Sequence, residues 1–247
     1  MILARLVTAV VFLWVFTSHA DAQAFVEAVS TGDANRVSSL LVAGSADVNE
    51  QDDIGITGLM VASIANDSAM VELLLKHGAD PTMGSFNGMT ALHAAAYNVS
   101  DAVAPLLISA GAKPNVFDSA GRTPLMVAAT SGATNVATAL LDAGAATEFR
   151  DRKGNTALMI ACGSKNMNVM TELLDRGADP NTRDLMGRTP AMLVCVHGEY
   201  EMLRLLLKMG ADPTLMDYST RTALSYAKEY NRRSCIRVLV NEHGVKY

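Results

Sequence analysis

Residues 118–129 read DSAGRTPLMVAA, and this stretch decides the fold of the chain. Asp118 and Gly121 are turn residues, because an Asp side chain bonds nearby backbone amides and Gly adopts backbone angles that other residues avoid. Thr123 suits the position before a helix, and Pro124 suits the first helical turn, where no amide donor is needed. The apolar residues that follow lie at helical spacing. The stretch therefore predicts a turn and then a short helix with a narrow apolar face.

A second helix is predicted after the first. Gly132 interrupts the first helix, and Val136, Leu140 and Leu141 then form the apolar side of a longer one. Gly144 is expected to end this second helix in a left-handed conformation. Neither helix can bury its apolar face alone, so the core must come from stacking such units on one another.

The same unit recurs with a period of 33 residues along the chain. The capping threonines are Thr57, Thr90, Thr123, Thr156, Thr189 and Thr222. The glycines that end the second helices are Gly78, Gly111, Gly144, Gly177 and Gly210. Several residue types held in phase at this period indicate an array of small units, each stacked only on its neighbours.

The repeated unit resembles the ankyrin repeat, whose pattern reads roughly D-x-x-G-x-T-P-L-H-x-A-A and then V-x-x-L-L-x-x-G-A-D-x-N. The matching segments are Asp118–Leu125, Val71–Asp80, Leu173–Asn181 and Leu206–Asp212. The resemblance extends from residue 24 to about residue 244. It implies an all-α solenoid, a curved stack of helix-turn-helix units that carry β-hairpin or loop fingers. Because this family binds very varied partners, the resemblance implies binding but names no partner.

We divide residues 23–247, the predicted ankyrin-repeat domain, into seven units. They span about 24–51 (an N-terminal cap), 52–84, 85–117, 118–150, 151–183, 184–216 and 217–247 (a C-terminal cap). The last unit has Thr220 where Gly is expected and a polar run over residues 228–233. Terminal repeats need a polar outer face, so these departures are typical of a cap.

The histidine that follows Thr-Pro-Leu in the family pattern is present only as His93. Four other units carry methionine there, namely Met60, Met126, Met159 and Met192. A thioether cannot donate a hydrogen bond, so we expect these units to rely on packing.

The first 22 residues stand outside the repeat. Arg5 precedes the run LVTAVVFLWVF over residues 6–16, which is apolar except for Thr8, and residues 20–22 (ADA) offer a small-x-small pattern. These features are typical of a secretory signal peptide over residues 1–22, cut after Ala20 or Ala22. The run is shorter than the about 20 residues that span a membrane. We therefore expect export to the periplasm or outside the cell, and membrane contact only through an uncut leader.

Composition excludes some classes of function and structure. The net charge of −5 argues against nucleic-acid binding, which normally needs a strongly basic face. Half the residues are hydrophobic but only 5% are aromatic, so small aliphatic side chains and methionine must fill the core. Cys162 and Cys195 lie one period apart, on helices expected about 8–10 Å apart, whereas a disulfide needs Cα atoms within about 7 Å. With Cys235 they are expected to be buried thiols.

The sequence offers no recognisable reactive motif. It contains no phosphate-binding Gly-Lys-Ser loop, no Gly-x-Ser-x-Gly elbow and no His-Glu-x-x-His. The histidines are scattered, and one methionine per repeat is too sparse for a shared soft metal. We therefore expect a non-enzymatic protein with no cofactor, no metal site and no small-molecule substrate.

The fingers between units are the candidate binding surface, because they hold aromatic, Met and Arg residues of the types enriched at interfaces. The candidate partner-binding residues are Phe86, Met89, Tyr97, Phe117, Arg122, Arg150, Arg152, Lys153, Arg183, Leu185, Arg188, Tyr218 and Arg221. Each later finger also has one Asp, which we expect to be bonded within its own turn. The alternative is a solvated loop face without a partner.

These observations predict a protein–protein interaction module that binds through its concave finger and inner-helix face. The expected partner has an acidic and partly apolar epitope. Arg150, Arg152, Arg183 and Arg188 are expected to pair with its carboxylates. Phe86, Tyr97, Phe117 and Tyr218 are expected to be the buried anchors. An alternative is an exported accessory or chaperone-like subunit that supports a redox or metal enzyme.

Overall fold

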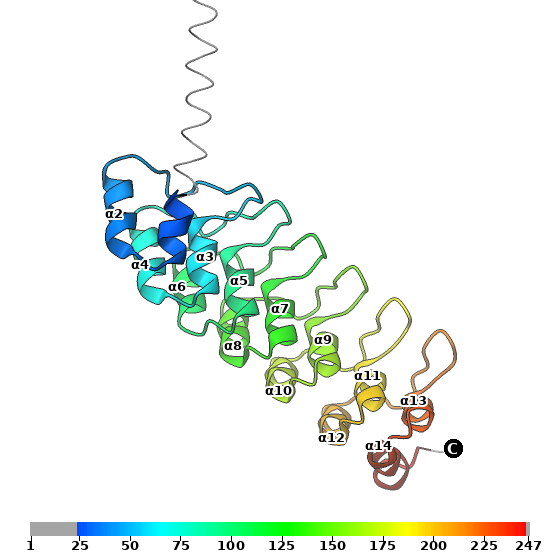
Figure 1. The fold of residues 1–247 in the computed structure, drawn as a ribbon. Helices are drawn as coiled ribbons and strands as arrows, with labels where there is room; N and C mark the ends of the chain where they lie inside the picture. Colours follow the sequence, from blue (N-terminus) through cyan, green and yellow to red (C-terminus); the bar gives the residue numbers. More distant parts are fainter. Residues whose placement is uncertain (1–23, 246–247) are drawn as a thin grey trace, which may run out of the picture. The chain divides into compact units, whose positions relative to one another are not determined.

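The computed structural model describes residues 24–245, and the signal peptide predicted for residues 1–22 lies outside them (Figure 1). All regular structure within the described residues is helical, which confirms the all-α class. Antiparallel pairing there is limited to two isolated bridges, Gln51–Thr57 and Gly84–Thr90, so the fingers are mainly loops. In the same range, no helix combines the length and the apolar character that a membrane crossing requires.

The chain divides into two compact units, the first of which ends at Lys113. Residues 24–30 form its first helix. The other helices of this unit are α2 (Ala34–Val42), α3 (Gly58–Ile64), α4 (Ser68–Lys76), α5 (Ala91–Tyr97) and α6 (Val103–Ser109). Helix α3 packs against α5, and α4 packs against α6, so the helices lie in two layers.

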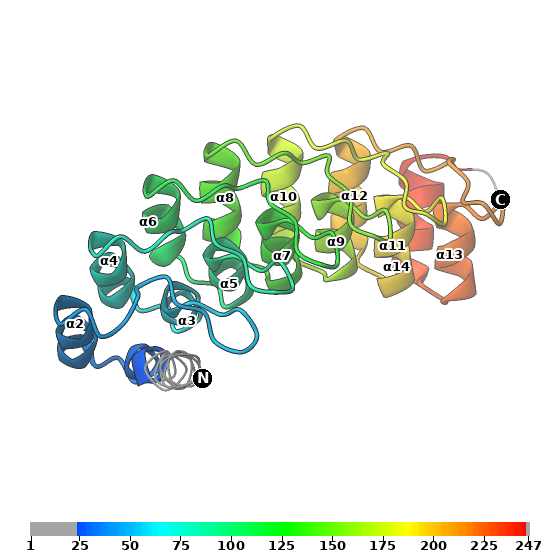
Figure 2. The same cartoon turned by 90° about the horizontal axis from the view of Figure 1, so that it is seen from above.

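The second unit begins at Pro114 and holds the remaining helix pairs. These helices are α7 (Pro124–Ser131), α8 (Thr134–Asp142), α9 (Ala157–Gly163), α10 (Met167–Asp175), α11 (Pro190–His197), α12 (Tyr200–Lys208), α13 (Ala223–Glu229) and α14 (Arg233–Arg237), which continues into η1 (Val238–Glu242). Helices α7, α9, α11 and α13 form one row, and α8, α10 and α12 lie in the other (Figure 2). The fingers connect one pair to the next.

The helix boundaries follow the local signals in the sequence. Thr123 accepts a hydrogen bond from the Met126 amide at 3.3 Å, and Pro124 occupies the first turn of α7. Gly132 then ends α7 in the left-handed conformation, with a φ of 77°. The same threonine, proline and glycine arrangement frames α11. These findings confirm the predicted turn, cap and helix order.

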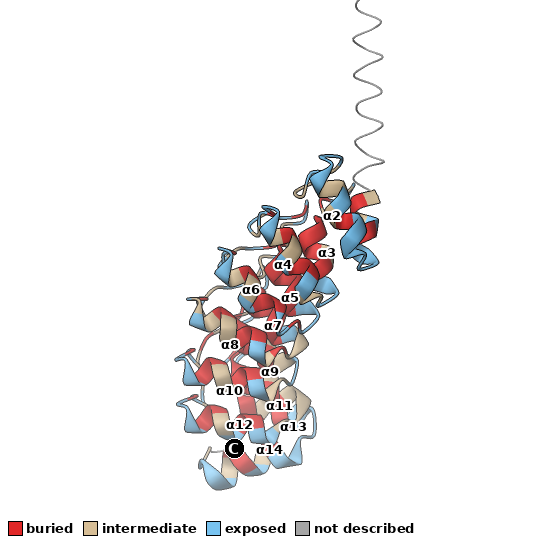
Figure 3. Ribbon diagram, turned by 90° about the vertical axis from the view of Figure 1, so that its left-hand side faces the viewer, coloured by how far each residue is buried: buried red, intermediate tan, exposed pale blue. Residues whose placement is uncertain are grey.

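Small aliphatic residues and methionine make up most of the core. Figure 3 shows that the buried residues lie mainly on the helices, whereas most finger residues are exposed or intermediate. The four methionines that replace the family histidine are each at most 1% exposed, which confirms their packing role. Met192 also accepts a hydrogen bond from the Thr189 amide through Sδ at 3.4 Å. His93 Nδ1 accepts from the Thr90 amide in the same way, at 3.2 Å. Met192 therefore accepts the same backbone hydrogen bond as His93, although its thioether cannot donate one.

Candidate functional site

Each finger of the second unit is a tight turn held by its own aspartate. In the finger of residues 118–122, Asp118 Oδ1 accepts hydrogen bonds from the amides of Ala120 (2.9 Å) and Arg122 (2.8 Å). Asp151, Asp184 and Asp217 bond the equivalent amides of their fingers. The prediction that these carboxylates are bonded within their own turns is confirmed.

Backbone hydrogen bonds join successive fingers of the second unit. The amide of Arg152 donates to the Ala120 carbonyl at 3.2 Å. The Leu185 amide donates to the Lys153 carbonyl at 3.1 Å. In the next finger, the Tyr218 amide donates to the Met186 carbonyl at 3.0 Å. The fingers are therefore held in a constant register, one bond per step.

Two glycines lie beneath exposed side chains of the following finger. A Cβ added at Gly154 would lie 2.8 Å from the Leu185 amide nitrogen and 3.0 Å from Leu185 Cγ. A Cβ at Gly187 would lie 2.9 Å from Tyr218 Cδ1 and 3.0 Å from Cε1, so the ring lies over this glycine. Both glycines also have positive φ angles, of 81° and 77°. No role was predicted for these glycines from the sequence, although their place three residues after each Asp was an available signal.

Three of the candidate cations are paired with the aspartate of their own finger. Arg122, Arg188 and Arg221 contact the carboxylate four residues earlier, at 2.7, 2.7 and 3.0 Å respectively. Those aspartate side chains are at most 3% exposed. The charges of these three arginines are therefore largely compensated, and fewer cations are open to a partner than the sequence suggested.

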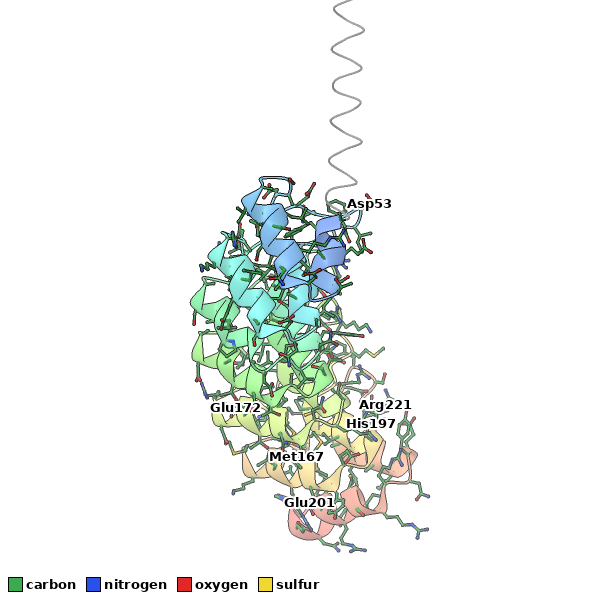
Figure 4. The ribbon with its side chains drawn as sticks, turned by 60° about the vertical axis from the view of Figure 1, so that its left-hand side comes forward. Asp53, Met167, Glu172, His197, Glu201 and Arg221 are labelled. Atoms are coloured by element: carbon green, nitrogen blue, oxygen red, sulfur yellow. The ribbon has the colours of Figure 1, made fainter. Side chains whose placement is uncertain are left out.

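The last finger is held further by a buried tyrosine. The hydroxyl of Tyr226 donates to Asp217 Oδ2 at 2.8 Å, and the Arg221 guanidinium lies 4.4 Å from the centre of the Tyr226 ring. Burial, together with the hydrogen bond to Asp217, raises the pKa of Tyr226 to about 12. Figure 4 shows Arg221 at the finger edge, on the side away from Glu172 of the second helix row. These contacts give Arg221 a structural role within its own finger.

Arg150 also forms hydrogen bonds that join two fingers. Its Nη1 donates to the Gly154 carbonyl at 3.1 Å and to the Arg183 carbonyl of the next finger. Gln51 makes the equivalent pair of bonds in the first unit. Arg150 thus bridges two fingers through neutral carbonyl oxygens, and within residues 24–245 its guanidinium has no carboxylate partner.

Arg152 and Lys153 lie in a finger whose aspartate is bonded by an asparagine in place of an arginine. Its residue four places after the aspartate is Asn155, and the Asn155 side chain bonds both oxygens of Asp151, at 3.3 and 3.1 Å. Both cations are exposed, and within residues 24–245 neither has an acidic partner. The half-buried Arg183 likewise has no such partner there.

Three large apolar side chains lie next to these cations in the following two fingers. Leu185 is 68% exposed, Met186 is 62% exposed and Tyr218 is 73% exposed. We define the finger patch as five residues of three consecutive fingers, listed as Arg152, Lys153, Leu185, Met186 and Tyr218. It is the part of the candidate surface in which exposed apolar groups and uncompensated positive charge adjoin.

The other candidate residues lie outside this patch. Phe117 packs edge-on against Phe149, with ring centres 5.0 Å apart, and is about half exposed. Phe86 and Tyr97 are exposed in the first unit, where Met89 is half-buried. Among the described residues, no cluster of three His, Cys, Asp or Glu side chains could hold a metal ion.

Comparisons with known proteins identify the repeat. The family model described as ankyrin repeats (3 copies) matches residues 25–118, 103–184 and 172–247. The chain belongs to the ankyrin repeat family. The crystal structure of the human ASB11 ankyrin repeat domain is similar, with a TM-score of 0.77 and 22% sequence identity. That match covers 86% of this chain and 96% of the other, and it shows the ankyrin solenoid fold.

Two curated relatives match over a shorter range. The mitochondrial disaggregase of Homo sapiens is 45% identical over 67 residues, and that of Bos taurus is 44% identical over 61. These segments make up 27% and 25% of this chain, and they span 9% of the length of each relative. Ankyrin repeats indicate a protein–protein interaction module and suggest a protein partner, and their fold is typically non-enzymatic.

Neighbouring ankyrin repeats are also joined on the side of the second helices. Asn181 Nδ2 donates to the Gly210 carbonyl at 2.9 Å, and Asn181 Oδ1 accepts from the Asp212 amide at 2.7 Å. Asn115 makes the same two bonds to the next repeat. Asn115 and Asn181 therefore each fix one repeat to the next, in addition to the backbone bonds between fingers, and the Asn181 link supports the finger patch.

Proposed function

We propose that this ankyrin protein captures a protein partner through the finger patch, and that the recognised epitope is acidic and partly apolar. One observation carries the proposal: Leu185, Met186 and Tyr218 are exposed apolar groups, and they adjoin two cations that have no acidic partner in the described chain. Large apolar groups beside Arg are typical of the centre of a protein interface.

The apolar part of the patch supplies the larger share of the binding free energy. Removing a Leu or Met side chain from water contributes about 1.5–3 kcal/mol, and interface tyrosines often contribute about 2 kcal/mol or more. Leu185 and Tyr218 lie against the glycines of the preceding finger, so their backbones are already fixed by the inter-finger bonds. Binding therefore orders few additional groups, which keeps its entropic cost low.

The charged part of the patch selects an acidic partner. Arg152 and Lys153 attract carboxylates, and an arginine can bond both oxygens of one carboxylate. Such charges at the edge of an interface mainly raise the association rate and discriminate between partners. Arg122, Arg188 and Arg221 contribute less than the sequence suggested, because each already contacts an aspartate.

The leader pattern in residues 1–22 supports export, so the proposed partner belongs to the periplasm or the outside of the cell. The alternative, an accessory subunit of a redox or metal enzyme, uses the same surface. It differs in that the captured protein is one enzyme, whose activity falls when the patch is altered.

A pull-down from the exporting compartment tests the proposal. The full chain is compared with a variant carrying Arg152→Glu and Lys153→Glu. The matched control carries Lys76→Glu and Lys208→Glu, which reverse two exposed charges at the ends of α4 and α12. We expect the partner to be lost, about tenfold or more, only with the patch variant. Equal recovery by the patch variant and the wild type rejects this surface.

A further inference from the structure

The finger patch has a regular spacing that restricts the conformation of its ligand. Arg152, Leu185 and Tyr218 occupy the same position in three consecutive fingers, since the amide of each donates to the preceding finger over 3.2, 3.1 and 3.0 Å. Lys153 and Met186 form a second, parallel column one residue further on. A ligand that contacts the whole patch therefore meets charged, aliphatic and aromatic groups in a fixed order.

The step between contacts follows from helix packing. The three fingers precede α9, α11 and α13, and these helices pack directly against one another. Packed helices lie about 8–10 Å apart, so the fingers are separated by about the same distance. A single ligand segment must place its contacting side chains at this interval and on one face.

The polyproline II conformation meets both conditions with the shortest segment. It has three residues per turn and rises about 3.1 Å per residue, so residues i, i+3 and i+6 lie on one face, about 9.3 Å apart. A β-strand covers the same distance in three residues but turns the third side chain to the opposite face. An α-helix needs about seven residues per step, because it rises about 1.5 Å per residue.

The chemistry of Tyr218 also favours this conformation. Its ring lies over Gly187, so the opposite ring face is turned outward as a flat apolar surface. Its hydroxyl has no hydrogen-bond partner within residues 24–245 and can donate to a ligand. A polyproline II segment has free backbone carbonyls and packs on aromatic rings, whereas the carbonyls inside a helix are already bonded.

We infer that the finger patch recognises an extended polyproline II segment in which an acidic residue, an aliphatic residue and a proline follow one another at three-residue intervals, in either chain direction. The acidic residue faces Arg152 and Lys153, the aliphatic residue faces Leu185 and Met186, and the proline packs on Tyr218. This inference rests on the proposed function of the patch. It adds the conformation and the residue spacing of the ligand.

Fluorescence anisotropy with synthetic peptides and the full chain tests this inference. The probe is a labelled peptide Gly-Glu-Pro-Ser-Leu-Pro-Ser-Pro-Gly, together with the same sequence in reverse order. A peptide of equal composition with Leu moved one position toward Glu tests the spacing. A helical peptide without proline tests the conformation. It places Glu, Leu and a second apolar residue at intervals of seven residues.

We expect one of the two three-residue-spaced peptides to bind at least tenfold more tightly than the shifted and helical peptides. Leu185→Ser and Tyr218→Ser should each weaken this binding about tenfold. Phe86→Ser is the matched control, because Phe86 is an equally exposed finger residue over Gly55 in the first unit, and it should leave binding unchanged.

Three results overturn the inference: equal binding of the spaced and shifted peptides, tighter binding of the helical peptide, or an equal loss with Phe86→Ser. If pull-down of the protein partner still depends on Arg152 and Lys153, only the extended-segment inference fails. If the pull-down is also insensitive to the patch, the proposed function fails with it.

Discussion

The hydroxyl of Thr220 donates a 2.7 Å hydrogen bond to the carbonyl oxygen of Ser219. In the earlier fingers of this unit, the equivalent carbonyls accept the amide of the next finger. Thr220 stands where those fingers have glycine, with a φ of 61°. The Ser219 carbonyl is therefore bonded by a side chain of its own finger, whereas the equivalent carbonyls accept an amide of the following finger.

Removing this hydroxyl should destabilise the last repeat. Thr220→Val keeps the branched shape but leaves the Ser219 carbonyl to water, and we expect a loss of about 1 kcal/mol in the free energy of unfolding. Urea denaturation followed by circular dichroism measures it. Thr220→Gly should recover stability, because glycine removes the strain of a positive φ. A Val variant as stable as the wild type contradicts this role of the hydroxyl.

The glycine beneath Tyr218 should tolerate no side chain. Gly187→Ala places a methyl group 2.9 Å from the Tyr218 amide nitrogen, so the finger bond must shift. Gly177→Ala is the matched control, because Gly177 also has a positive φ (85°) but has no atom within 4 Å of the added Cβ. We expect Gly187→Ala to lower the free energy of unfolding by about 1–3 kcal/mol more than the control. Equal losses in urea denaturation would show that only backbone strain matters.

The asparagine link between repeats should also be measurable. Asn181→Ala removes both bonds to the next repeat, at 2.9 and 2.7 Å, and should cost about 1–3 kcal/mol of the free energy of unfolding. Glu148 occupies the same position one repeat earlier and accepts only from the neighbouring Thr147, so Glu148→Ala should have little effect. Similar unfolding midpoints for both variants would contradict the assigned role.

Acid should destabilise the fingers through their aspartates. Burial opposes the charge of Asp118 and Asp217, but amide, guanidinium and hydroxyl donors outweigh it, so the pKa of each is lowered from 3.8. The folded state thus binds fewer protons than the unfolded state. Their stabilisation is present above the unfolded pKa and is lost as the pH falls through the lower folded pKa.

Replacing these two carboxylates should flatten the acid dependence of stability. We expect a variant with Asp118→Asn and Asp217→Asn to lose less stability than the wild type between about pH 5 and pH 3, where carboxylates titrate. Urea midpoints measured across this range test it. Asp175→Asn, at an exposed site, is the control and should retain the wild-type pH profile. An unchanged profile in the double variant contradicts the assignment.

The three buried cysteines should differ in reactivity. Burial raises the pKa of Cys162 well above its ordinary value. The contact with Cys235, together with burial, raises the pKa of Cys195, whereas the hydrogen bond from Cys195 lowers the pKa of Cys235. The thiolate is the reactive form. Because Cys235 lies in the terminal repeat, we expect maleimide in mild urea to label Cys235 before Cys162, as mass spectrometry would show. The reverse order contradicts this.

The repeat architecture was predictable because its determinants are local. Thr123 caps, Pro124 starts and Gly132 ends a helix through interactions within a few residues, and the 33-residue period repeats them. The pairing of Arg122 with Asp118 is equally local, at a separation of four residues. It could have been foreseen, and it would have removed Arg122 from the list of cations open to a partner.

By itself, the sequence determined the helix pairs, the finger turns and the aspartates that hold them, since each depends on neighbours along the chain. Only the tertiary structure decided which finger residues remain open to a partner. Arg150 and Arg152 are nearly adjacent in sequence and both are exposed, yet within residues 24–245 only Arg150 of the two uses its side chain to bond a carbonyl 33 residues away. That difference arises from the apposition of successive fingers, because hydrogen-bond partners from different repeats meet only when the repeats are stacked.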